Sequence, residues 1–121
     1  MLVSRPIDTA PLDRLLVFAG PTGAAALIAA LLDDLKTTQS NFNLAWNGPD
    51  FAALRTNSHV MIALAGTIGD TELHALSQHL YAAATTQCVS DIMDMKPKIM
   101  AGLSELITLL TSLQTDAGHR S

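Results

Sequence analysis

The sequence predicts one all-α domain over residues 1–121, folded as an antiparallel up-down four-helix bundle with a short N-terminal capping helix. Aliphatic residues and alanine dominate, and aromatic residues make up only 4% of the chain. Apolar residues recur at steps of three and four, which is the spacing of one face of an α-helix. Glycine and proline fall at a few boundaries between these periodic segments, so the predicted connections are short turns.

The first two helices are separated by a glycine–proline pair. A short helix is expected to begin at Thr9, because the proline that follows fits a first turn, and to end at Gly20. A second helix is expected from Pro21 to about Trp46. Residues 37–43 are poor helix formers, so a bend or break there stays open. The apolar face of this second helix is formed by Ile28, Leu31, Leu35, Phe42 and Ala45.

The third and fourth helices have clear start signals. Gly48 and Asp50 mark a stop and a new N-cap, and the third helix is expected to end at Gly69. Asp70 is expected to cap the fourth helix, with Glu72 in its first turn near the positive end of the helix dipole. The predicted core face of the fourth helix consists of Leu73, Leu76, Leu80 and Ala83.

The last helix has the most regular apolar pattern of the chain. Pro97 lies inside this pattern, so either a kink or a helix that begins at this proline is expected. The final residues are expected to fray. The predicted core stripe, interrupted by Lys96, consists of Val89, Ile92, Ile99, Leu103, Leu106, Leu110 and Leu113.

Composition excludes several classes of function. The net charge is −4 and no cluster of lysine or arginine is present, which argues against a nucleic-acid partner. Cys88 is the single cysteine, so a disulfide framework and a cysteine zinc site are excluded and a cytoplasmic location is expected. The apolar run over residues 15–32 is broken at Gly20, which leaves less than the roughly 20 residues of a membrane span. We therefore expect a soluble protein whose apolar run forms a short helix, a turn and a buried helix.

One histidine of the third helix is predicted to face solvent. The apolar residues of this helix form one stripe, interrupted only by Ser58, and His59 lies ~120° from its centre. One and two turns further along are Ala63 and Gly66, which are too small to shield an imidazole. The stripe consists of Phe51, Leu54, Met61, Ala65 and Ile68.

The sequence from His59 to Gly69 resembles the histidine-phosphotransfer (HPt) family of two-component phosphorelays. His59 matches the phosphoacceptor, and Leu-Ala-Gly-Thr-Ile-Gly at residues 64–69 matches the second half of the family motif. The lysine and glycine that usually follow the histidine are replaced by Ile62 and Ala63. Helix order also matches, so the resemblance covers the core, about residues 8–115.

The resemblance implies a phosphocarrier without independent turnover or cofactor. His59 would accept a phosphoryl group from an aspartyl phosphate of a response-regulator receiver domain and pass it to another receiver. A hybrid histidine kinase is a further expected partner, and no small-molecule substrate is expected. The expected docking face consists of His59, Ala63, Gly66 and Asp70. Arg55, one turn before the histidine, is expected to replace part of the missing lysine charge.

Other interpretations stay open. A degenerate module that binds a receiver or kinase without accepting phosphate would account for the missing Lys-Gly pair. An unrelated helical scaffold with an accidental motif match is a third hypothesis. His74, Gln78 and Tyr81 share a face of the fourth helix and flank His59 or simply form a solvated surface.

Metal and thiol chemistry are not expected. Neither Glu72 nor Glu105 has a histidine three residues later, as a di-metal bundle would need, and His74 and His79 do not share a helix face. His119 has no partner at a useful spacing either. The single cysteine lies next to no histidine.

Overall fold

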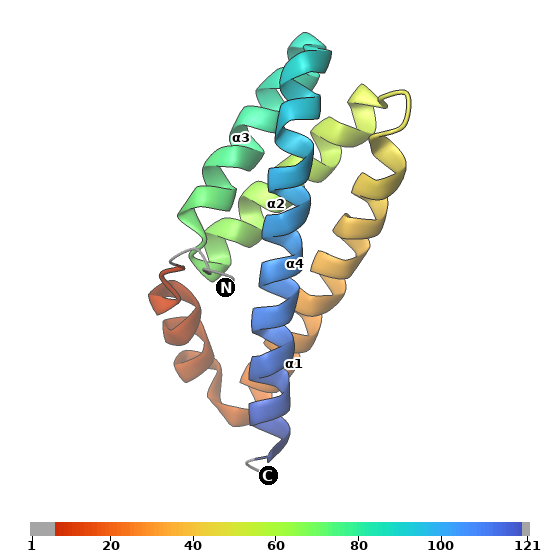
Figure 1. Cartoon of the computed structure of the whole chain (residues 1–121). Coiled ribbons are helices and arrows are strands. Elements are labelled where there is room, and N and C mark those ends of the chain that lie inside the picture. The colour runs from red at the N-terminus through yellow and green to blue at the C-terminus, as the bar shows by residue number, and fades with distance from the viewer. Residues whose placement is uncertain (1–6, 120–121) are drawn as a thin grey trace, which may run out of the picture.

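The computed structural model describes residues 7–119, which form four α-helices and no strand. In chain order these are α1 (Ala10–Ala45), α2 (Phe51–Ile68), α3 (Thr71–Thr86) and α4 (Val89–His119). α2 and α4 each contact both α1 and α3, and Figure 1 shows the four helices gathered side by side. The prediction of an all-α helical bundle is therefore confirmed.

α1 consists of two helical segments that meet at a sharp change of direction. Gly20 has φ 77° and ψ 174°, which is outside the helical region and unfavourable for any residue with a side chain. Pro21 then begins the long segment, because its fixed φ suits a first helical turn. Figure 1 shows the chain turning back here, between the red and the orange ribbon. The boundary predicted at Gly20 is confirmed.

The helices continue through two positions at which the sequence allowed a break or a new start. α1 continues through residues 37–43 to Ala45, with Phe42 fully buried and the Thr38 hydroxyl bonded to the Asp34 carbonyl at 2.7 Å. This back-bonding satisfies a hydroxyl that would otherwise compete with the helix. α4 begins at Val89 and continues through Pro97, so the alternative start at this proline is wrong. Val89 itself is 46% exposed, because the first turn of α4 lies at the edge of the core.

The turns that frame α2 follow their predicted chemistry. The Asp50 carboxylate accepts from the Ala53 N–H at 3.1 Å and caps the start of the helix. Gly69 ends the helix in the left-handed region at φ 100°. A Cβ on Gly69 would clash with the backbone carbonyl of Asp8, so the segment before α1 passes directly over the α2–α3 turn.

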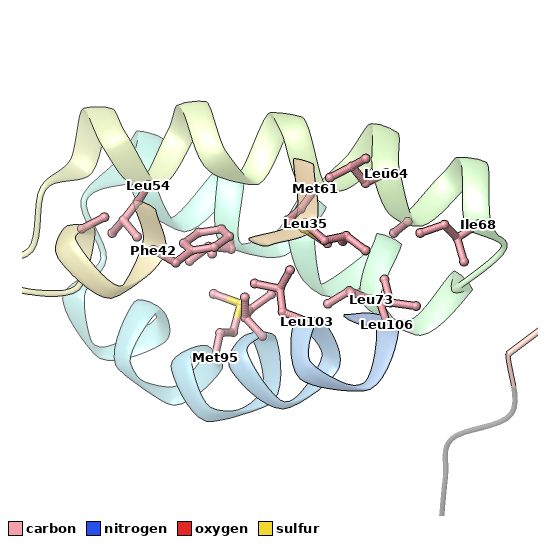
Figure 2. Close-up of a cluster of buried hydrophobic side chains, with 14 of the residues drawn as sticks. Leu35, Phe42, Leu54, Met61, Leu64, Ile68, Leu73, Met95, Leu103 and Leu106 are labelled. Atoms are coloured by element: carbon pink, nitrogen blue, oxygen red, sulfur yellow. The ribbon is translucent and has the colours of Figure 1, made fainter. Parts of the chain in front are cut away.

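The core is a continuous set of aliphatic side chains from all four helices. Figure 2 shows Leu35 and Phe42 of α1 facing Leu54 and Met61 of α2, with Leu103 of α4 beneath them. Leu12, from the first segment of α1, is also fully buried. Further fully buried members are Ile68, Leu73, Leu80, Ile92, Ile99, Leu106 and Leu110.

The first half of α1 is more exposed than the sequence pattern indicates. α1 is long and apolar enough to cross a membrane by length and composition, and only 17% of its most apolar 18-residue window is buried. Phe18 and Val17 are 93% and 82% exposed. The expectation of a buried helix is thus wrong for most of residues 21–30. The reason is the length of α2, which has half as many residues as α1 and lies beside only its second half (Figure 1), while the described residues of α3 do not contact α1.

Candidate functional site

The rotation of α2 in the bundle places His59 on the surface. Leu54, Met61 and Ile68 are fully buried, which turns the opposite side of the helix toward solvent. Ser58, the polar residue within the apolar stripe, is buried and donates to the Leu54 carbonyl at 2.6 Å. Its hydroxyl is thereby satisfied without a partner from another helix. The predicted exposure of His59 is confirmed.

α2 and α3 form an antiparallel hairpin whose register brings their surface residues together. The ring centroids of His59 and Tyr81 are 6.2 Å apart, with the ring planes inclined by 50°. Near the turn, a Cβ on Gly66 would lie 3.6 Å from Cδ2 of His74. Each pair joins one residue of α2 to one of α3, and the two pairs are two helical turns apart. The surface that these four residues share is called the α2–α3 face below.

Small side chains keep the α2–α3 face low around the imidazole. Ala63 and Gly66 are both exposed. Ile62, which occupies the position of the family lysine, is half-buried and so packs partly against the bundle. Ala63 and Gly66 therefore leave His59 open to a partner along α2, while the Tyr81 ring on α3 lies 6.2 Å from the imidazole.

Asp70 does not belong to this exposed surface. Its side chain is 0% exposed, and its carboxylate accepts from the Leu73 N–H at 3.0 Å as the N-cap of α3. The expectation that Asp70 forms part of a docking face is wrong. The physical reason is that a capping carboxylate turns back onto its own helix, and here the turn is covered by the segment around Asp8.

The remaining candidates lie at different places on the surface. Arg55 is exposed on α2, one turn before His59, as expected. His74 is half-buried beside Gly66, whereas Gln78 and His79 are exposed on α3. The side chain of His119 lies outside the described residues. The structure thus brings His74 and Tyr81 next to the predicted α2 site, which the sequence left open.

Among the side chains that the structure describes, those of residues 7–115, no group of three or more His, Cys, Asp or Glu is placed to hold a metal ion. Cys88, at the start of α4, is half-buried, with its Sγ 3.7 Å from the Ser90 hydroxyl. Of the two imidazoles on the α2–α3 face, that of His59 is exposed and that of His74 is half-buried.

No family model, curated protein or solved structure matches this chain.

The sequence predicted the contact between His59 and Tyr81 only as one of two alternatives. The signal was present as a spacing, because both His59 and Tyr81 lie about three turns from the glycine–aspartate turn that joins their helices. Two antiparallel helices joined by so short a turn must bring such positions to the same level. Which side of each helix faces the other depends on the packed core.

Proposed function

We propose that this chain is a histidine-containing phosphotransfer protein of a two-component phosphorelay. It carries a phosphoryl group on His59 between the receiver domains of response regulators and acts as a phosphocarrier rather than a turnover enzyme. The observation that carries the proposal is the exposed His59 imidazole on a face kept low by Ala63 and Gly66. A cofactor is not part of the proposal.

The chemistry needs only one nucleophilic nitrogen from this chain. A lone pair of the neutral His59 imidazole attacks the phosphorus of an aspartyl phosphate on the receiver. The new N–P bond forms as the P–O bond to the aspartate breaks, and that electron pair returns to the carboxylate. The other ring nitrogen releases its proton to water. The receiver supplies the metal ion and the cation that neutralise the phosphoryl oxygens.

The small residues on the α2–α3 face give the proposal its geometry. A receiver must bring its aspartyl phosphate within bonding reach of the imidazole, so its surface must lie flat against α2. Exposed Ala63 and Gly66 leave room for this approach, and a larger side chain would hold the partner away. Gly66 also lies against His74 rather than beneath a long side chain.

The finer architecture of the fold fits the same proposal. We infer an up-down topology, because each helix contacts its two neighbours in chain order or, for α1 and α4, each other. We infer that the first segment of α1 caps the bundle, since Gly20 reverses the chain and Leu12 is fully buried. Both features belong to the HPt-like arrangement, and they leave the face around His59 uncovered.

A cytoplasmic location is part of the proposal, since aspartyl phosphates of receivers are made there. Two features weigh against α1 as a membrane span despite its apolar composition. Gly20 interrupts its helical geometry, and the far end of α1 contributes Leu35 and Phe42 to the centre of the core. Removing α1 into a bilayer would therefore expose the faces of α2 and α4 that these side chains cover.

The deciding experiment is incubation of the protein with radiolabelled phosphorylated receivers. Acid-labile, base-stable label is expected on the wild type and absent from His59→Gln. The matched control is His79→Gln, which removes another exposed histidine from α3 and should keep the label. Label that persists on His59→Gln would overturn the assignment of the phosphoacceptor.

A second candidate function is receiver or kinase binding without phosphoryl transfer. The half-buried Ile62 favours it, because the family's lysine charge is missing next to His59. Binding without label, detected by titration, would establish this candidate. It shares the docking face, so Gly66→Arg should abolish binding in either case, and unchanged binding would place the partner elsewhere.

Restoring the family cation separates the two candidates further. Ile62→Lys should speed transfer severalfold if the wild type is a slow carrier, because a nearby ammonium stabilises phosphoryl charge by ~0.2–1 kcal/mol at a wet surface. The matched control is Ile62→Gln, which adds length without charge. A chain that stays unlabelled in all three forms but still binds a receiver in titration is a module that binds its partner without accepting phosphate.

A further inference from the structure

An exposed tyrosine of α3 lies against the proposed phosphoacceptor. Tyr81 is 41% exposed, and the centroid of its ring is 6.2 Å from that of His59 with the planes tilted by 50°. Tilted arrangements at this separation are a favourable geometry for two aromatic rings. The core side of α3 is filled by Leu73, Leu80 and Ala84, so burial does not require an aromatic residue at position 81.

The geometry points to Tyr81 as the residue that positions the His59 imidazole for attack on a receiver's aspartyl phosphate. This inference rests on the proposed function. A surface histidine without neighbours moves among several staggered side-chain conformations, and only some aim a ring nitrogen at a docked partner. A ring 6.2 Å away on the neighbouring helix limits the side-chain conformations that the imidazole can adopt.

The remaining surroundings explain why a positioning contact would matter in this chain. Ala63 and Gly66, on the open side of the imidazole, are too small to restrict its rotation. Ser58, next in sequence, is bonded to its own helix and faces the core. Among the described residues, Tyr81 therefore supplies the ring contact that His59 receives from another helix.

The inference separates two kinds of phosphoryl donor. A receiver docks in one orientation, so its transfer rate depends on how often the imidazole points the right way. Phosphoramidate is small and approaches from any open side. In that reaction the imidazole nitrogen bonds to phosphorus as the donor's P–N bond breaks, and the amine leaves as ammonia after taking a proton from water. Its rate depends on exposure of the ring and hardly on its orientation.

The experiment compares wild type, Tyr81→Phe, Tyr81→Leu and Tyr81→Ala with both donors. Tyr81→Phe should stay within twofold of the wild type, because the ring is kept. Tyr81→Ala should lose about tenfold with the phosphorylated receiver and stay within twofold with phosphoramidate. Tyr81→Leu, which keeps apolar bulk without a flat ring, should lie between them. The control is Phe18→Ala, which removes a 93% exposed ring from α1 and should change neither rate.

A spectroscopic readout tests the contact without any transfer. The ring-proton resonances of His59, assigned by comparison with His59→Gln, should shift in Tyr81→Ala and not in Phe18→Ala, because an aromatic ring perturbs the protons beside it. Unfolding curves establish that each variant is folded. If Tyr81→Ala does not fold, the comparison of Tyr81→Phe with Tyr81→Leu tests the positioning role instead.

The outcomes distinguish this inference from the proposed function. Equal receiver rates for wild type and Tyr81→Ala would overturn the positioning role and leave the phosphocarrier proposal standing. Equal losses with both donors would also overturn it, since that result reports a general change in the site. A wild type that neither donor labels would overturn the phosphocarrier proposal and the role of Tyr81 together.

Discussion

Gly69 offers the sharpest test of how the chain before α1 is attached to the bundle. We predict that Gly69→Ala destabilises the fold by about 2–4 kcal/mol, whereas Gly48→Ala costs only about 1–2 kcal/mol. Both glycines have a positive φ, 100° for Gly69 and 108° for Gly48, so the backbone strain of an alanine is similar at the two positions. Their surroundings differ, because nothing lies within 4 Å of a Cβ on Gly48.

The additional cost at Gly69 comes from the segment that crosses it. A Cβ there would meet the carbonyl of Asp8 and lie 3.2 Å from Cδ of Pro11. Backbone atoms cannot rotate away, so the whole segment must shift, and it carries the fully buried Leu12. Full exposure of a leucine side chain costs about 1.5–3 kcal/mol, of which a partial shift loses a share.

Urea and thermal unfolding of the two variants measure the difference directly. The lower midpoint is expected for Gly69→Ala, at roughly 4 °C per kcal/mol for a domain of this size. If Gly69→Ala and Gly48→Ala lose the same stability, the contact between Asp8 and the α2–α3 turn does not contribute to folding, and the reasoning is refuted.

Three further predictions concern the residues around the α2–α3 face. Gly66→Ala should stabilise the protein by up to about 1 kcal/mol in unfolding experiments, because alanine is the better helix former and its Cβ would make an ordinary 3.6 Å contact with His74. A lower unfolding midpoint would contradict the register of the α2–α3 hairpin. Asp70→Ala should lower the free energy of unfolding by about 0.5–2 kcal/mol through loss of the cap, at least as much as Asp50→Ala, which removes an exposed cap. Receiver titrations of the folded Asp70→Ala variant should be unchanged, and weaker binding at full stability would return Asp70 to the docking face. Arg55→Ala should slow receiver-dependent labelling severalfold, and an unchanged rate would show that this guanidinium does not replace the family lysine.

Local signals predicted most of the helix boundaries. Gly20, Asp50 and Gly69 each act through their own backbone or the next turn, so their effect can be read without knowing the rest of the fold. The exposure of His59 was predictable for a similar reason, since seven buried positions of one helix fix where the opposite side points. Such inferences need only the geometry of a single helix.

The helix interiors were harder to predict from sequence, because propensity and packing disagree there. Residues 37–43 are poor helix formers, yet α1 continues because Phe42 and Ala45 are buried against the other helices. Packing of an apolar face generally contributes more than the small propensity differences that suggested a break. The same holds for Pro97, which α4 accommodates between the buried Met95 and Ile99.

The sequence by itself determined the all-α class, the turns and the outward direction of His59, because each follows from the repeat of one helix or the chemistry of one cap. Only the tertiary structure decided that Tyr81 lies beside His59, that Asp70 is buried and that the first half of α1 is largely exposed. These three facts depend on the relative lengths and rotations of neighbouring helices. A periodic pattern gives the side that a helix buries, whereas the residues it meets are set by how the whole core packs.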